Sequence, residues 1–219
     1  MNNIIIVGDS FCSSADGWPS MLAEQLKLNL ISHGIGGQPW WDAREFLINL
    51  PKDAVDNAEF IVFVHTNSDR IPTVNKAIGQ IDHNNLGPLE IEQAVKLYFK
   101  YIHDHKFLMW AQQQWFRDIT KLWGHKKICH LHSFPWSLDF KDSITGLNVN
   151  TNLCSLSLNE LGASEFILFN DSRPNHFNEN NNRELANQLA NILTNYTPGS
   201  TVLDVDQFDF KTRLWLDWK

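Results

Sequence analysis

Four features of this sequence have the chemical types that acyl transfer requires. They are the hydroxyl of Ser10, the imidazole of His176, the amide of Asn67 and a glycine-rich loop that ends at Gly37. Acyl transfer needs a nucleophile, a general base and donors for the oxyanion that develops on the substrate. The sequence therefore predicts a hydrolytic site, provided that the fold brings these four features together.

The elements that must position them alternate along the chain. Short apolar runs predict strands at residues 4–7, 28–31, 60–64, 128–134 and 165–169, and helical spacing predicts helices at residues 19–28, 41–50, 90–103, 106–123 and 178–193. Alternation of this kind is typical of a parallel sheet with helices on both faces. We therefore expect an α/β fold, a three-layer α/β/α sandwich with a five-stranded, mainly parallel sheet.

The candidate residues share one position relative to these strands. Ser10, Gly37 and Asn67 each follow an apolar run, and His176 lies between the last predicted strand and the last predicted helix. Because ligands of open parallel sheets bind beyond the carboxyl ends of the strands, we expect all four at one edge of the sheet. We expect one domain over residues 1–197, with residues 198–219 packed on it as a C-terminal appendage.

Composition excludes several classes of protein. The chain has 219 residues, 43% of them hydrophobic, and a formal net charge of −7, which argues against a nucleic-acid binder. No apolar stretch is long enough to span a bilayer, and the apolar run at residue 4 leaves no room for a secretory signal. Three widely spaced cysteines are typical of free thiols in a reducing compartment. We expect a cytoplasmic location, although a viral structural protein would have the same features.

These motifs, in this order, resemble those of the SGNH, or GDSL-type, hydrolases, which are serine esterases with a flavodoxin-like α/β/α fold. The resemblance runs from the first predicted strand to the last predicted helix. It implies that Ser10 is the nucleophile and His176 the base. It also implies an oxyanion hole made by the backbone N–H groups of Ser10 and Gly37 and by the side chain of Asn67.

The sequence departs from the family pattern at two places. His65 and Ser68 stand where the third motif of the family has glycine and aspartate. Arg173 stands three residues before His176, where the family has the acid of the triad, and the nearest upstream acid is Asp171. Three interpretations remain open: Asp171 orients the His176 ring, a backbone carbonyl does so, or Arg173 marks a loss of activity.

Three further residues are candidates for substrate contact, namely His65, Trp40 and Gln38. His65 lies at a strand end near Asn67. Trp40 follows the glycine loop, where an aromatic ring could stack on a sugar, line an acyl pocket or simply belong to the core.

The remaining histidines and cysteines have structural interpretations. His130 and His132 share a strand face and could be metal ligands, but without an evident third ligand an ordinary half-buried face is favoured. His103 and His105 lie at a junction between predicted helices that we expect to be solvated. Cys12 is expected to pack as a small apolar side chain.

The sequence thus favours a serine esterase that removes a small, acetyl-like acyl group from a polar or carbohydrate substrate, with no metal and no cofactor. The partner is a small-molecule or carbohydrate ester, with no nucleic acid and no membrane, and the oligomeric state is left open. The alternative is a non-catalytic binding or structural protein of the same fold, such as a viral particle component, which Arg173 favours. A nucleotide site at residues 33–37 is disfavoured because the loop lacks the lysine of a P-loop.

Overall fold

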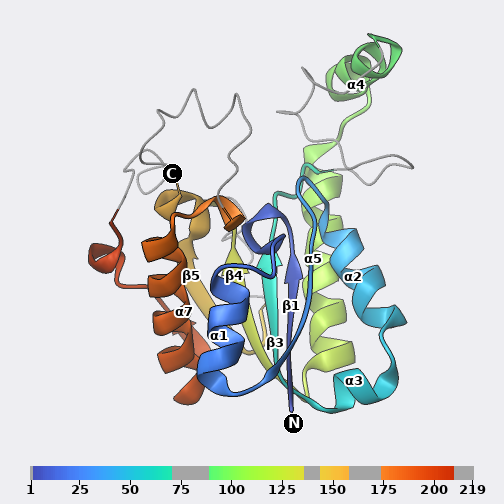
Figure 1. Ribbon diagram of the computed structural model, residues 1–219. Coiled ribbons are helices and arrows are strands. Elements are labelled where there is room, and N and C mark those ends of the chain that lie inside the picture. Colours follow the sequence, from blue (N-terminus) through green and yellow to red (C-terminus); the bar gives the residue numbers. More distant parts are fainter. Residues whose placement is uncertain (1, 71–88, 136–143, 158–173, 210–219) are drawn as a thin grey trace.

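The computed structural model describes residues 2–70, 89–135, 144–157 and 174–209 (Figure 1). Within these ranges one sheet has the strand order β2-β1-β3-β4-β5-β6, and every neighbouring pair is parallel. The strands are β1 (Asn3–Gly8), β2 (Asn29–Gly34), β3 (Ala58–His65), β4 (Lys127–His132), β5 (Leu147–Asn152) and β6 (Gly199–Thr201). The α/β class with a parallel sheet is therefore confirmed.

The described sheet has six strands, so the expected count of five was wrong. Strand β5 lies in a segment without a clear apolar period, because Asn148, Asn150 and Asn152 interrupt it. Strand β6 opens the predicted C-terminal appendage and pairs with β5. The strand predicted at residues 165–169 lies outside the described residues. The proposed division at residue 197 stays a prediction.

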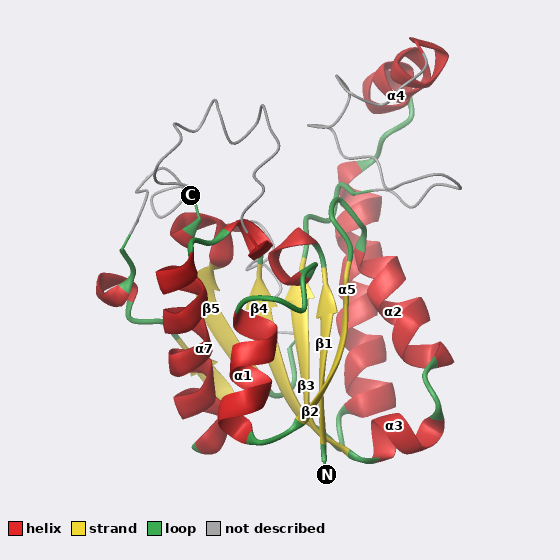
Figure 2. Ribbon diagram, in the orientation of Figure 1, coloured by secondary structure: helices red, strands yellow, loops and turns green. Residues whose placement is uncertain are grey.

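Helices cover both faces of the sheet (Figure 2). One face carries α1 and α7, and the other carries α2, α3 and α5, while α4 stands away from the sheet near the start of α5 (Figure 1). Short 3₁₀ turns follow several strands, and two of them, η1 and η4, lie at the candidate site. The bounds are η1 (Ser10–Cys12), α1 (Trp18–Leu26), α2 (Trp40–Asn49), α3 (Lys52–Asp56), α4 (Leu89–Tyr101), α5 (His105–Trp123), η3 (Leu153–Leu156), η4 (Pro174–His176), α7 (Glu179–Thr194) and η5 (Val205–Gln207).

Strand β1 shows why its sequence is a continuous apolar run. Ile4 and Ile6 face the core beneath α1 and α7, whereas Ile5 and Val7 face the core beneath α2 and α5. All four side chains are fully buried. A parallel strand that is buried on both faces needs apolar residues at every position, which is the pattern observed.

The strand order sets the place of the site. From β1 the chain crosses to β2 on one side and then returns to β3 on the other side. The crevice beyond the carboxyl ends of β1 and β3 is therefore the topological switch point, where open α/β sheets bind their ligands. Among the described residues, no helix combines the length and the apolar character needed to cross a bilayer.

Close approach of β1 to β3 requires glycine at position 8. A Cβ on Gly8 would lie 2.3 Å from the Val64 carbonyl oxygen, whereas a Cβ on Gly36 would meet only Ser10 Cβ, at 3.9 Å. We expect Gly8→Ala to lower the free energy of unfolding by about 1–3 kcal/mol through overpacking. Urea unfolding followed by circular dichroism measures this effect, with Gly36→Ala as the control. Equal stability of the two variants would contradict the packing argument.

Candidate active site

Ser10 begins the 3₁₀ turn η1 directly after β1. The turn forms because the Asp9 side chain caps it, accepting a hydrogen bond from the Phe11 N–H at 3.1 Å. Asp9 is therefore a turn residue whose carboxylate bonds to nearby backbone. Ser10 is partly exposed, and within the described part of the chain its hydroxyl makes no hydrogen bond. The hydroxyl is therefore available to a ligand at the switch point.

The glycine loop after β2 lies beside Ser10. The Ile35 N–H donates to the Gly8 carbonyl at 3.3 Å, which keeps the loop next to the end of β1. The Gln38 N–H then donates to the Ile35 carbonyl at 3.2 Å, closing a tight turn. Gly37 is the third residue of this turn and has a φ of 79°, a conformation that glycine adopts without strain.

Asn67 lies two residues beyond β3, in a turn of its own. Its Oδ1 accepts a hydrogen bond from the Asp69 N–H at 3.0 Å. Because a backbone N–H can only donate, this contact fixes which end of the amide is oxygen. The Nδ2 group then remains as a donor, and it donates to none of the residues that the structure describes.

His176 is brought to η1 by the 3₁₀ turn η4. The rings of His176 and Phe11 lie 4.9 Å apart, so the imidazole is next to the residue that follows Ser10. His176 and Asn175 have φ values of 64° and 56°, in the left-handed region that non-glycine residues seldom adopt. Such a backbone persists only where surrounding contacts hold it in place.

Two asparagine side chains supply those contacts. Asn175 Oδ1 accepts from the Ser14 N–H at 2.8 Å, and its Nδ2 donates to the Ser14 carbonyl. Asn182 Oδ1 accepts from the Trp18 N–H at 2.9 Å, while its Nδ2 donates to the Pro174 carbonyl at 3.1 Å. The loop that carries His176 is thus fastened to the segment between η1 and α1, a role that the asparagine-rich sequence did not indicate.

A buried charged cluster lies beneath the site. The Asp9 side chain is fully buried, and its Oδ2 forms an ion pair with Arg70 Nη1 at 3.1 Å. Its Oδ1 also accepts from Ser133 Oγ at 2.8 Å. Arg70 Nη1 donates in addition to the Gln38 carbonyl at 3.5 Å. These contacts join the ends of β1, β3 and β4 to the glycine loop, and sequence reasoning missed both Arg70 and Ser133.

His65 belongs to a buried histidine cluster with His130 and His132. His65 is 2% exposed, and its Nε2 lies 2.7 Å from His130 Nδ1. Because His130 Nε2 must donate to the Thr145 carbonyl, at 3.0 Å, neutral His130 accepts at Nδ1 and His65 Nε2 is the donor. The expectation of a half-buried face at 130 and 132 was wrong, since both are buried. Substrate contact by His65 stays a prediction, and the His65 side chain is buried.

Burial keeps these imidazoles neutral. Desolvation lowers the pKa of His130 to about 3 and that of His132 to about 4. It also lowers the pKa of His65 well below its usual value, with the nearby His130 and His132 as further causes. The three side chains are therefore uncharged at neutral pH.

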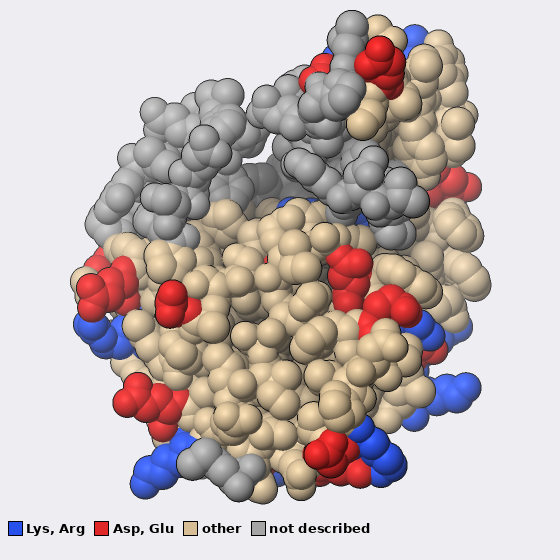
Figure 3. Space-filling model, turned by 45° about the vertical axis from the view of Figure 1, so that its right-hand side comes forward, with Lys and Arg blue, Asp and Glu red and all other residues tan. Residues whose placement is uncertain are grey.

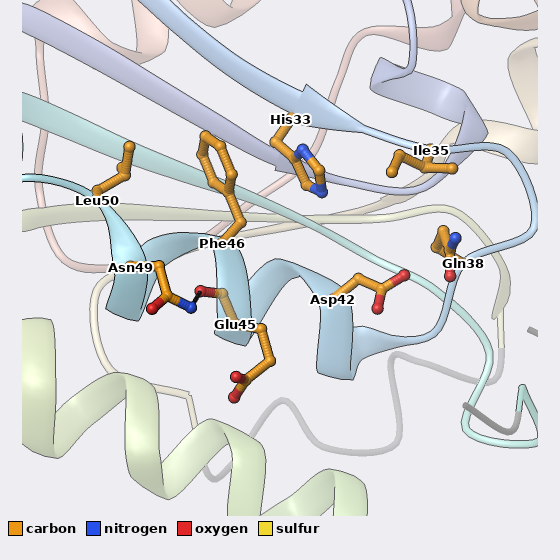
Figure 4. A pocket seen from close by; sticks show the side chains of 8 residues that line it. All are labelled: His33, Ile35, Gln38, Asp42, Glu45, Phe46, Asn49 and Leu50. Carbon is orange, nitrogen blue, oxygen red and sulfur yellow. Dashed lines mark hydrogen bonds between the residues drawn. The ribbon is translucent and has the colours of Figure 1, made fainter. Parts of the chain in front are cut away.

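An open groove of about 440 Å³ lies along β2 and α2 (Figure 4). His33 stacks on Phe46 in its wall, with ring centroids 4.3 Å apart. Burial lowers the pKa of His33 and raises that of Asp42. The polar residues that line it are His33, Gln38, Asp42, Glu45 and Asn49. Gln38 follows Gly37, so the groove begins in the same loop.

The other residues for which the sequence predicts a role or a position are Trp40, Cys12 and Asp171. Trp40 stacks on Trp115, with ring centroids 5.9 Å apart, and packs against the core beneath α2 and α5, so its role as a substrate contact stays a prediction. Cys12 is buried, as expected, and burial raises the pKa of its thiol. The cysteines within the described ranges are free thiols. Asp171 lies outside the described residues, and its place in a triad stays a prediction.

The described surface carries no broad basic patch on the face that Figure 3 presents, where acidic and basic groups are interspersed. This distribution agrees with the net charge of −7.

Comparisons with known proteins give distant similarities. No family model matches the sequence, and no curated protein matches it. A candidate lipolytic protein of the G-D-S-L family from Desulfitobacterium hafniense DCB-2 is 13% identical, with a TM-score of 0.44, and the match covers 88% of this chain and 99% of that one. A candidate GDSL-like lipase from Parabacteroides merdae ATCC 43184 is 12% identical, with a TM-score of 0.34 and coverages of 88% and 74%.

The buried Asp9–Arg70 ion pair predicts that replacing Arg70 destabilises the fold strongly. We expect Arg70→Ala to lower the free energy of unfolding by about 3 kcal/mol, because it leaves the Asp9 carboxylate buried without its cation. Urea unfolding measures the change. The control is Arg44→Ala, since Arg44 pairs with Glu45 and Asp118 at the surface, where such pairs contribute about 1 kcal/mol or less. A loss for Arg70→Ala no larger than the control's would contradict a stabilising role for the cluster.

The buried histidines predict a pH dependence of stability. Their pKa is lower in the folded protein than the ordinary 6.5, so the unfolded chain binds more protons and stability falls as the pH drops from about 6.5 towards about 4. We expect His132→Gln to reduce this slope by about 1.4 kcal/mol per pH unit, the value for one proton. Urea unfolding at several pH values measures it. The control His125→Gln changes an exposed histidine outside the cluster and should keep the full slope.

Proposed function

We propose that this protein is a serine hydrolase of the SGNH type, which cleaves a carboxylic ester through Ser10. The observation that carries the proposal is the meeting of four segments at the carboxyl ends of β1 and β3. Ser10 lies beside the loop of Gly37, the η4 turn packs His176 against Phe11, and Arg70 joins the turn of Asn67 to Asp9. A hydroxyl, a base and neutral donors at the switch point are what ester cleavage needs.

The mechanism follows from the donors that these segments leave available. His176 takes the proton of Ser10 Oγ as the hydroxyl attacks the ester carbonyl. The backbone N–H groups of Ser10 and Gly37 and the Asn67 Nδ2 group donate to the oxyanion, and none of these donors bonds to another described residue. Collapse of the tetrahedral intermediate breaks the ester C–O bond, and His176 gives the proton to the departing alcohol. Water, which passes a proton to His176, then attacks the acyl–Ser10 carbonyl; the carboxylic acid leaves and Ser10 Oγ takes the proton back.

The third member of the triad is proposed on sequence alone. Asp171 is the nearest acid upstream of His176 and would hold the ring in the orientation that accepts the serine proton. The two consecutive left-handed residues at 175 and 176 support a role for this loop, because strained backbone of this kind is concentrated at functional sites.

The groove beside Gly37 supports a polar substrate. His33 and Gln38 enter it from the β2 side, and Asp42, Glu45 and Asn49 enter it from α2 (Figure 4). Such a lining offers hydrogen bonds to hydroxyl groups, beside the apolar side chains of Ile35, Phe46 and Leu50, on which the face of a sugar ring could pack. We therefore propose a small, acetyl-like acyl group on a polar or carbohydrate substrate, with the leaving group in this groove.

A non-catalytic binding protein of the same fold is the second candidate. One observation favours it: Arg173 stands at the position of the family's acid. The same groove would then hold a polar ligand without turnover.

The hydrolase proposal is tested with a serine-reactive fluorophosphonate and with p-nitrophenyl acetate. We expect the wild type to be labelled and to turn over the ester, and Ser10→Ala to lose both. The matched control is Ser20→Ala, which removes an exposed hydroxyl that donates only to the Gly17 carbonyl. A folded wild type that is neither labelled nor active would overturn the proposal in favour of the binding protein.

The same assay examines the oxyanion hole. Asn67→Ala should lower kcat by about a hundredfold or more, because one preorganised donor is worth about 3–4 kcal/mol in the transition state. We expect the fold to persist, because Asn67 is partly exposed and the substitution removes from the turn the hydrogen bond that the Asp69 N–H donates; circular dichroism checks this. The matched control is Asn29→Ala, which removes an exposed amide at the start of β2, at the opposite edge of the sheet from the site, and should leave kcat within about threefold of the wild type.

A further inference from the structure

Three side chains from two distant segments converge next to the turn of Asn67. Asp69 belongs to that turn, while His103 and His105 lie at the junction of α4 and α5. His105 Nδ1 lies 2.9 Å and His103 Nε2 lies 3.4 Å from Asp69 Oδ1. One potential ligand atom from each residue lies within 4.8 Å of the others. The junction was expected to be solvated, yet its two histidines face a carboxylate.

We propose that Asp69, His103 and His105 form a binding site for a first-row divalent transition metal such as Zn²⁺. Two imidazoles and one carboxylate are a ligand set that suits zinc, whereas magnesium and calcium prefer oxygen ligands alone. Ligand atoms about 2.0–2.1 Å from a tetrahedral metal lie about 3.3 Å from one another. The distances of 2.9 and 3.4 Å are therefore close to the spacing that a bound ion requires.

The local backbone explains why both histidines face Asp69. Asp104 lies between them as the N-cap of α5, with φ −120° and ψ 100°, and its side chain accepts from the Phe107 N–H. In extended backbone, side chains two positions apart lie on the same side of the chain. The cap therefore directs His103 and His105 together towards the turn after β3.

The surroundings of His103 point to a ligand in the space between the three residues. Its Nε2 atom is buried, and although it lies near Asp69 it makes no hydrogen bond with any residue the structure describes. A buried polar atom without a hydrogen bond costs free energy that a bound cation would recover. Its ring is held from the other side by Phe99, with centroids 5.0 Å apart.

Access to the site is provided by His105. Its side chain is 58% exposed, whereas those of Asp69 and His103 are 17% and 14% exposed. An ion could therefore enter from solvent past His105 and keep water in the remaining coordination position, which is the arrangement of three-ligand zinc sites. This inference does not depend on the proposed esterase, since it concerns binding and not turnover.

Metal binding is tested on the full chain after treatment with EDTA and removal of the chelator. Isothermal titration with Zn²⁺ should show one ion per chain, and Co²⁺ should give visible absorption bands of a four-coordinate site. Because the ion joins the α4–α5 junction to the turn after β3, Zn²⁺ should also raise the Tm, whereas Mg²⁺ should not.

The variants Asp69→Asn, His103→Gln and His105→Gln should each weaken Zn²⁺ binding by about tenfold or more. His125→Gln, an exposed histidine outside the site, should bind as the wild type does. Circular dichroism checks the fold of each variant. If Asp69→Asn or His103→Gln fails to fold, the result for His105→Gln tests the proposal, because the His105 side chain is the most exposed of the three. Absence of a stoichiometric ion in the wild type, or equal weakening by His125→Gln, would overturn the proposal.

Discussion

The buried carboxylate of Asp9 is the constraint on which the arrangement of the site depends. A carboxylate without exposure to water costs several kcal/mol unless its oxygens are paired and hydrogen-bonded. Here the Phe11 N–H, the Ser133 hydroxyl and the Arg70 guanidinium supply those partners. Because Arg70 follows β3 and Ser133 follows β4, satisfying one charge holds three strand ends together. The position of Ser10, one residue after Asp9, is set by the same contacts.

The parts of this arrangement that can be predicted from sequence are local or follow from topology. The apolar run of β1 and the helical spacing of α1 depend on residues that are neighbours in the chain, and both elements form as expected. Parallel strands bring their carboxyl ends to one edge, so a strand pattern alone places Ser10, Gly37 and Asn67 near one another. No exact distance follows from such reasoning, because side-chain partners far apart in the chain decide it.

The features that were missed all involve polar groups buried by distant partners. Arg70 is 61 positions from Asp9, and nothing near it in the sequence distinguishes it from a solvated loop residue. Strand β5 was missed because its asparagines break the apolar pattern, although Asn148 is buried and accepts a hydrogen bond from His132. His65 looked like a strand-end residue open to substrate, yet His130 gives it a partner inside the core. In each case a distant side chain forms a hydrogen bond or an ion pair with a polar group that sequence reasoning assigns to the surface.

The turn after β3, residues 67–70, contains several of these polar groups with distant partners. Arg70 pairs with Asp9 and donates its N–H to the Asn67 carbonyl, while the Asp69 N–H donates to Asn67 Oδ1. The backbone carbonyl and the side-chain oxygen of Asn67 are therefore each held by one of the residues that follow it. A cation held by the Asp69 carboxylate would restrain the same turn from outside, as the Asp9 ion pair restrains it from inside. The position of the proposed oxyanion donor thus depends on the Asp9–Arg70 ion pair, and a cation bound at Asp69 would add a second restraint.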